Sequence, residues 1–366
     1  MTSSVYLDWN ATTPPLPRVI EVMADVAARA WGNPASVHGS GRAARDVVET
    51  AREAIAAATG ASARDVIFTS GGTEANNLAL HQAPALVTSA LEHPSVTRVA
   101  EALEAKGRPV RWLPVPSSGR LEPSAVEAAL ADLAPGAVVA VAPANHETGV
   151  IQALSAIAEV VRARGARLHV DAVQALGKLP ADAWSSADTL AIAAHKIRGP
   201  KGIGALVHRP ERAPQALLLG GSQERGRRPG TVDAVAAAGF QVAVEWATSQ
   251  LEARARLAEL RERLELGLVR LGAVVHGAEV PRLGHVSNVG FASQAGDELV
   301  AALDLMGVAV SSGSACSAGT TEPSKVISSM LGVERARRAV RVSLGDATSE
   351  SDIERALAAF ERALRL

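Results

Sequence analysis

The chain has 366 residues, with 37 Lys and Arg against 38 Asp and Glu, and 48% of its residues are hydrophobic. This length and composition exclude a single minimal core, a disordered chain and a collagen-like repeat. The formal net charge of −1 gives no overall attraction to nucleic acid. The apolar stretch 136–144 is far shorter than the roughly 18 residues of a membrane span. We therefore expect no nucleic-acid or membrane partner.

The single cysteine, Cys316, cannot form an internal disulfide. The N-terminal residues have neither a basic patch nor a long apolar run, so they predict no targeting segment. Both features are typical of an intracellular protein, and we expect a cytoplasmic location.

Short apolar and β-branched runs alternate with longer segments of helical period. This alternation predicts βα units around a mainly parallel sheet, in a large α/β domain over residues 15–255. In chain order, the predicted strands are Val66–Thr69, Ala85–Thr88, Val138–Ala142, Arg167–Asp171, Thr189–Ala193 and Gly204–Val207.

The segment 233–272 has helical composition without proline, which predicts one long helix, or two, leaving the large domain. After this segment, short apolar runs and helical segments alternate again. This alternation predicts a smaller α/β domain over residues 256–366, joined by the N-terminal segment 1–14. The last helix is predicted to begin at the capping signal 349–352. The elements expected before it are a strand over His285–Ala292, a helix over Asp297–Leu305, and strands over Val308–Ser311 and Val340–Leu344.

Two glycine-rich stretches differ in their context. The stretch 39–44 fits G-x-G-x-x-A, but no strand precedes it, so we expect a loop leading into a helix over 43–58 and no dinucleotide site. The stretch 70–74 joins a buried strand to a helix N-terminus, where free N–H groups and the helix dipole suit a phosphate. An ordinary tight turn explains 70–74 equally well.

Two charged residues follow predicted strands at the same edge of the sheet. Asp171 ends one strand, and Lys196 follows the next. Taken singly, Asp171 fits a helix cap and Lys196 fits a surface cation. Ligands in open α/β sheets bind outside the carboxyl ends of the strands, so the pair together indicates a binding site.

Cys316 lies in a segment of small, polar residues, 311–319, which is unlike the buried setting of most lone cysteines. A reactive thiol therefore competes with an inert one. No Cys or His spacing fits a zinc site, so we expect no metal.

Motifs along nearly the whole chain resemble the cysteine desulfurases, pyridoxal 5'-phosphate (PLP) enzymes of the class V aminotransferase group. The resemblance implies the fold type I architecture, and the cysteine segment resembles the branch with a long loop. The motifs lie at 6–14, 32–36, 68–74, 92–93, 145–149, 169–171, 195–196, 199–202, 225–231, 311–316 and 341–345.

This resemblance implies roles at the cofactor. Lys196 would hold PLP as a Schiff base and transfer protons, Asp171 would pair with the pyridine nitrogen, and His93 would stack on the ring. Gln174 and Asn145 would bind the phenolic oxygen. The phosphate would contact Gly72, Thr73, His195 and, from a second subunit, Thr231, which implies a homodimer.

The resemblance also implies the substrate and the reaction. Arg341, with Asn33, would bind the carboxylate of L-cysteine, since guanidinium favours a bidentate contact with it. Cys316 would take the sulfur as a persulfide and leave L-alanine. The sulfur would then serve iron–sulfur clusters, thiolated cofactors or tRNA, through a sulfur-acceptor protein that the sequence does not identify.

Two departures and two alternatives accompany this prediction. Ala193 and Ala194 replace the usual Ser-Gly, which removes one hydroxyl near the phosphate, and the chain ends at Leu366 without the longer tail that docks a scaffold in many relatives. One alternative is a selenocysteine lyase, or another PLP-dependent lyase or aminotransferase, in which Cys316 is dispensable. The other is a non-catalytic sulfur carrier or regulatory homologue.

Overall fold

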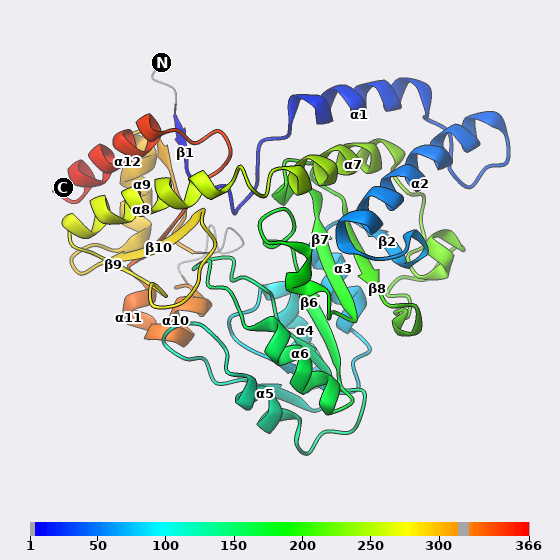
Figure 1. The fold of residues 1–366 in the computed structure, drawn as a ribbon, viewed down its shortest axis with the longest axis horizontal. Coiled ribbons are helices and arrows are strands. Elements are labelled where there is room, and N and C mark those ends of the chain that lie inside the picture. The colour runs from blue at the N-terminus through cyan, green and yellow to red at the C-terminus, as the bar shows by residue number, and fades with distance from the viewer. Residues whose placement is uncertain (1–3, 314–321, 366) are drawn as a thin grey trace.

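The structure is a computed structural model and describes residues 4–313 and 322–365. Its larger part is built on a seven-stranded sheet of order β2-β8-β7-β6-β5-β3-β4 (Figure 1). β8 runs antiparallel to both of its neighbours, and the other pairings are parallel. The strands are β2 Val66–Thr69, β3 Leu86–Thr88, β4 Val110–Trp112, β5 Val138–Ala140, β6 Arg167–Asp171, β7 Thr189–Ala193 and β8 Gly204–His208.

The six strands predicted for this part are all present, and the mainly parallel sheet is confirmed. The sequence did not predict β4, which lies at the edge of the sheet. Only Val110 of its three residues is buried, whereas Arg111 and Trp112 are exposed. Because so short a strand shows no apolar alternation, its sequence carries too weak a signal.

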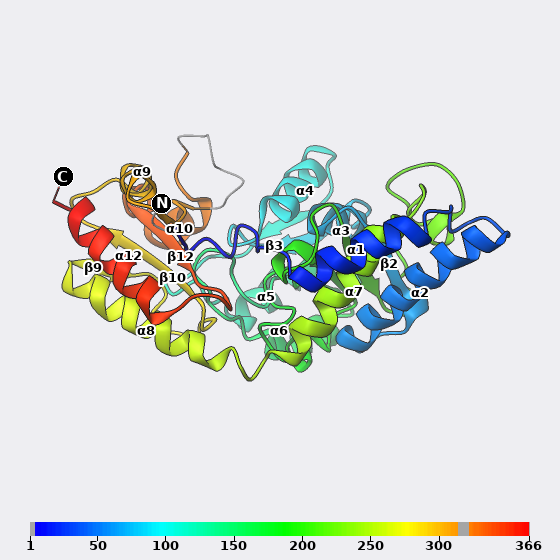
Figure 2. The same cartoon turned by 90° about the horizontal axis from the view of Figure 1, so that it is seen from above.

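Helices cover both faces of this sheet, because side chains alternate along each strand. Phe68, Val170 and Ile192 pack with one helical layer, and Ile67 and Ala191 pack on the other side, against α3. Figure 2 shows α4 on one side of the sheet and α5 and α6 on the other. The helices are α1 Pro17–Arg29, α2 Gly39–Thr59, α3 Gly72–Leu80, α4 Pro94–Ala105, α5 Pro123–Leu130, α6 Leu154–Ala163 and α7 Ala234–Ser249.

The glycine-rich stretch 39–44 forms the first turns of α2, so the expected loop at this stretch is wrong. His38 caps the helix, and its Nδ1 accepts from the amide of Gly41 at 3.3 Å. A Cβ at Gly41 would lie 2.5 Å from the carbonyl oxygen of Ser36. The glycine therefore serves close packing of the preceding turn rather than breaking the helix.

The smaller part has its own hydrophobic core and a three-stranded antiparallel sheet of order β12-β10-β9. Val5 and Leu7 of the N-terminal segment pack in this core, and the short strand β1 pairs with β11. The segment 233–272 forms two helices, α7 and α8. The elements here are β1 Val5–Tyr6, α8 Ala255–Arg270, β9 Ala273–Val275, β10 Val286–Phe291, α9 Gly296–Leu305, β11 Val308–Ala309, α10 Lys325–Leu331, α11 Val333–Ala336, β12 Ala339–Ser343 and α12 Glu350–Ala363.

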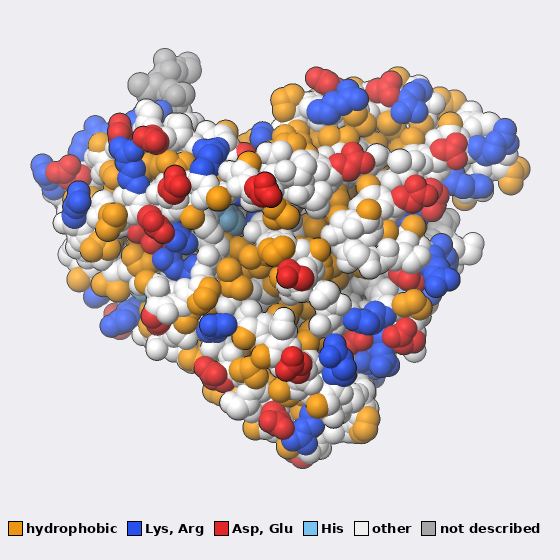
Figure 3. Space-filling view, viewed as in Figure 1, with side chains coloured by type: hydrophobic (Ala, Val, Ile, Leu, Met, Phe, Trp, Pro, Cys, Tyr) orange, Lys and Arg blue, Asp and Glu red, His pale blue; other side chains and the backbone are white. Residues whose placement is uncertain are grey.

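Among the described residues, no helix is long and apolar enough to cross a membrane. On the face seen in Figure 3, Lys and Arg side chains are interspersed with Asp and Glu. Neither sign forms a continuous patch there, in keeping with the net charge of −1.

Phe240→Ala tests how much the large core depends on α7. Phe240 is fully buried there. Its truncation leaves a cavity and is expected to lower the free energy of unfolding by about 3–5 kcal/mol, measured by urea denaturation. The control is Ile20→Ala on α1, where the side chain is 57% exposed and the expected change is within about 0.5 kcal/mol. Equal effects of the two substitutions would contradict the packing described.

Candidate active site

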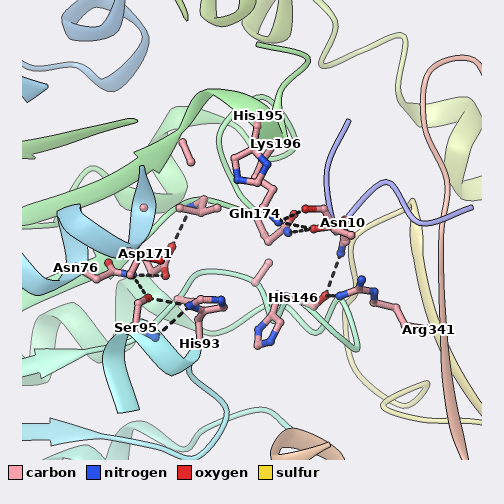
Figure 4. Close-up of a pocket in the computed structure, with 17 residues that line it drawn as sticks. Asn10, Asn76, His93, Ser95, His146, Asp171, Gln174, His195, Lys196 and Arg341 are labelled. Atoms are coloured by element: carbon pink, nitrogen blue, oxygen red, sulfur yellow. Dashed lines mark hydrogen bonds between the residues drawn. The ribbon is translucent and has the colours of Figure 1, made fainter. Parts of the chain in front are cut away.

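A cavity of about 200 Å³ lies at the carboxyl ends of β6 and β7 (Figure 4). The large sheet contributes Asp171 to its wall, the N-terminal segment contributes Asn10, and the smaller part contributes Arg341. Asp171 is the one carboxylate in the cavity wall as far as the structure describes it. Residues distant in the sequence therefore meet at the edge of the sheet where a ligand site was predicted.

Lys196 follows β7 in a short 3₁₀ turn, Ala194–Lys196. Its Nζ donates to the carbonyl oxygens of Asn10 and Ala11, each at 2.7 Å. The backbone amide of Thr13 also donates to the carbonyl of His195 at 3.0 Å, so the N-terminal segment is bound to this turn. The ammonium is thereby held at the cavity wall.

Asp171, the last residue of β6, is held by two donors. Asn76 Nδ2 donates to Oδ2 at 2.7 Å, and the amide of Val173 donates to Oδ1 at 3.1 Å. Asn76 is oriented in turn by His169, whose Nε2 donates to Asn76 Oδ1 at 2.9 Å. Burial lowers the pKa of His169 to about 3, so this imidazole is neutral. The carboxylate therefore has a fixed orientation at the cavity.

Sequence reasoning missed Asn76. Its only signal is a polar residue on the inner face of the helix that follows the glycine turn. Asn76 on α3 reaches Asp171 on β6 only because the helix packs against the strand in the folded chain.

His93 caps α4, and its Nδ1 accepts from the amide of Ser95 at 3.2 Å. The ring of His146 meets it edge-on, with centroids 5.6 Å apart and an interplanar angle of 73°. Burial is the main cause that lowers the pKa of His93, and it lowers that of His146 further. Both imidazoles are therefore neutral at neutral pH, and either is able to accept a proton.

His146 lines the cavity but was not among the predicted site residues, although it lies within the 145–149 motif. Its Nε2 is buried and has no hydrogen-bond partner among the described residues.

Behind His93 lies a buried carboxyl group, Glu92, which accepts from the amide of Ala142 at 3.1 Å. Burial raises the pKa of Glu92 to about 8, and the nearby Asp171 adds to this shift. Glu92 is therefore mainly protonated at neutral pH.

Arg341 on β12 brings a guanidinium to the cavity from the smaller part of the chain. Its Nη2 donates to Asp8 Oδ1 at 2.7 Å, and its Nη1 donates to the carbonyl of His146 at 3.3 Å. Its Nε is buried and has no partner in the described part of the chain. A buried cation with an unused donor is suited to a carboxylate ligand.

The N-terminus of α3 contributes Gly72 and Thr73 to the cavity wall. His195 also lines the cavity, with Nδ1 3.2 Å from Thr12 Oγ1. Burial, together with the charge of Lys196 and other lysines, lowers the pKa of His195 to about 4. His195 is therefore a neutral hydrogen-bonding group.

The structure brings eight of the predicted site residues to this cavity: Gly72, Thr73, His93, Asp171, Gln174, His195, Lys196 and Arg341.

Three other predicted residues are not part of this wall. Asn145 is buried, and its Nδ2 donates to the carbonyl of Leu91 at 2.9 Å. Its Oδ1 accepts from the amides of Glu147 and Thr148. The Asn145 carboxamide therefore stabilises its own turn. Asn33 is exposed, between α1 and α2. Asn33 therefore does not line this cavity, and its role beside Arg341 at the substrate carboxylate stays a prediction.

Thr231 is exposed, in the segment before α7, and does not line the cavity of its own chain. Cys316 lies outside the described residues. Within residues 4–313 and 322–365, no group of three His, Cys, Asp or Glu side chains could hold a metal ion.

Comparison with known proteins identifies the family. The model of the family Aminotransferase class-V matches residues 5–356. A cysteine desulfurase of Bradyrhizobium diazoefficiens is 40% identical over 97% of this chain and 93% of its own length, and a cysteine desulfurase IscS of Anaeromyxobacter is also 40% identical, over 97% and 91%. The structure of a NifS-like protein from Rickettsia africae superposes with a TM-score of 0.90, at 30% identity, and covers 99% of this chain and 100% of that one.

The chain therefore belongs to the aminotransferase class-V family, and within it to the cysteine desulfurases. The family predicted from the motifs is confirmed, and so is the fold class.

Proposed function

We propose that this protein is a PLP-dependent L-cysteine desulfurase, which converts L-cysteine to L-alanine and transfers the sulfur to Cys316 as a persulfide. The observation that carries the proposal is the meeting of Lys196, Asp171 and Arg341 at one cavity. The 40% identity to cysteine desulfurases along nearly the whole chain supports the choice of substrate.

The residues present fit PLP. A lysine amine, a carboxylate at a strand end and a helix N-terminus line one cavity, and they match the aldehyde, the pyridine nitrogen and the phosphate. When bound, the cofactor supplies an electron sink for the bonds around the substrate α-carbon. Within the described residues, the buried Nε2 of His146 and Nε of Arg341 have no hydrogen-bond partner, which leaves polar capacity for a ligand.

The residues of the cavity wall would hold the cofactor as follows. Lys196 would bind it covalently through its amine, and Asp171, oriented by Asn76, would keep the pyridine nitrogen protonated. His93 would contact the ring, and Gln174 would donate to the phenolic oxygen. Gly72, Thr73 and His195 would bind the phosphate.

Substrate binding and proton transfer involve Arg341, Lys196 and His93, which line the same cavity. Arg341 binds the substrate carboxylate with the donors that its contacts with Asp8 and His146 leave free. Lys196 and the neutral His93 accept and return protons at the α-carbon.

In the sulfur transfer, the thiolate of Cys316 attacks the substrate sulfur. The S–S bond forms as the C–S bond breaks, and the electron pair of the C–S bond passes to the β-carbon, which takes a proton and becomes the methyl group of alanine. A thiol acceptor or reductant then removes the sulfane sulfur from Cys316.

We also propose a homodimer in which Thr231 of a second copy completes the phosphate site. Arg228, in the loop that carries Thr231, donates from Nε to Glu74 Oε1 on α3 at 2.9 Å, so this loop is fixed relative to the phosphate end of the cavity. Trp31 is 73% exposed and Val37 is 83% exposed, so the connection between α1 and α2 presents apolar side chains for a partner copy to cover. The cytoplasmic location and the two domain ranges stay predictions.

The test of the proposed function is direct. Purified protein loaded with PLP is incubated with L-cysteine and dithiothreitol, and alanine and sulfide are measured. Equal amounts of alanine and sulfide are expected. A protein that takes up no PLP, or that forms pyruvate in place of alanine, would contradict the proposal.

Arg341→Lys tests the carboxylate contact. Lysine offers a point charge in place of a bidentate fork, so the KM for L-cysteine is expected to rise by about 10- to 100-fold, with kcat and the visible cofactor band little changed. Steady-state kinetics and absorption spectra measure both effects. The control is Arg338→Lys, at an exposed position before β12. An unchanged KM in Arg341→Lys would remove this arginine from the substrate site.

A further inference from the structure

Lys178 is a second lysine near the cavity, and the reaction above does not use it. It lies in the turn that follows β6, four residues after Gln174, and its Nζ contacts Gln174 Oε1 at 2.5 Å. Gly177, at a φ of +68°, brings this turn against α7, where an added Cβ would lie 2.6 Å from the Cβ of Ala247. The turn therefore holds Lys178 inward.

The surroundings of Lys178 are mainly cationic. Burial is the main cause that lowers its pKa far below the ordinary value, and Arg254, Lys196 and Arg341 lower it further. Asp346 acts in the opposite direction, but it pairs with Arg254 Nε at 3.3 Å. A lysine in such a place destabilises the fold rather than stabilising it. The hydrogen bond that Lys178 makes with Gln174 explains its position better.

A carboxamide presents an acceptor at one end and donors at the other, and its neighbours decide which end points where. Gln174 Oε1 accepts from Lys178, and Gln174 Nε2 donates to the carbonyl of Asn10 at 2.9 Å. The same carbonyl accepts from Lys196 Nζ at 2.7 Å. A flipped carboxamide would set oxygen against the Asn10 carbonyl, and the hydrogen bond from the Lys178 amine to Oε1 would be lost.

We propose that Lys178 is a positioning residue that fixes the carboxamide of Gln174 with its donor end toward Lys196 and the cavity. Gln174 then has one N–H on Asn10 and a second N–H available to the phenolic oxygen of the cofactor. This inference rests on the proposed function, because it assumes that PLP occupies the cavity. Without Lys178, the flipped carboxamide would present an acceptor to that oxygen, and binding would weaken.

The test compares Lys178→Met, Gln174→Ala and the double variant with the parent full-length protein. Lys178→Met is expected to weaken PLP binding by about five- to tenfold, the loss of one ordinary hydrogen bond, and to shift the visible absorption maximum in the same direction as Gln174→Ala. In the Gln174→Ala background, Lys178→Met should have no further effect on either quantity. The thermal midpoint of the cofactor-free protein should not fall. The control is Lys106→Met, at an exposed lysine at the end of α4.

The outcomes separate the two proposals. A parent protein that takes up no PLP overturns the proposed function. If the parent takes up PLP and Lys178→Met binds it equally well, only the role of Lys178 is overturned. The role of Lys178 would also be overturned if Lys178→Met weakened PLP binding equally in the parent protein and in the Gln174→Ala variant. Lys178 would then act by its charge rather than through the carboxamide.

Discussion

Lys196→Ala is expected to lower the rate of alanine and sulfide formation by at least about 1,000-fold and to remove the covalent attachment of PLP. We expect this effect because Lys196 is the lysine that lines the described cavity. The methyl group of alanine can neither bond to the cofactor nor carry a proton. Alanine and sulfide assays measure the rate, and mass spectrometry after borohydride reduction measures the covalent adduct.

The control for this substitution is Lys201→Ala, five residues further along the chain, where the side chain is exposed. It is expected to keep the adduct and the activity. A borohydride-stable adduct in Lys196→Ala would show that another lysine holds the cofactor and would overturn the assignment.

Cys316→Ser is expected to lower sulfide release by at least about 1,000-fold, because a serine oxygen does not accept sulfane sulfur. PLP binding should be unchanged, and addition of L-cysteine should still alter the visible spectrum, since Lys196, Asp171 and Arg341 remain in place. Stopped-flow absorbance and a sulfide assay separate binding from transfer.

The same variant decides between the alternatives that the sequence left open. Normal turnover of L-cysteine by Cys316→Ser would indicate a lyase that does not need this thiol. Spectral change without sulfide would favour the desulfurase. A parent protein that shows neither spectral change nor sulfide would favour the non-catalytic homologue.

The sequence alone determined the strands that carry the site, and their positions follow from local pattern. Asp171 and Lys196 end and follow two apolar runs, and neighbouring parallel strands bring their carboxyl ends to one edge of a sheet. Gly72 and Thr73 follow β2, which runs in the same direction as β7 because β8 between them is antiparallel to both. These predictions held because the apolar pattern that marks a buried strand extends over only a few consecutive residues.

The tertiary structure decided which side chains share the cavity. Asn76 and His146 line the cavity, although the sequence assigned neither of them a role there. Asn145 does not line it, because neighbouring amides use its carboxamide. The Lys178 contact with Gln174 depends on how closely the turn after β6 packs against α7. Other partners, such as Asn76 for Asp171 and Asn10 for Gln174, come from segments far apart in the sequence, and only the folded chain brings those segments together.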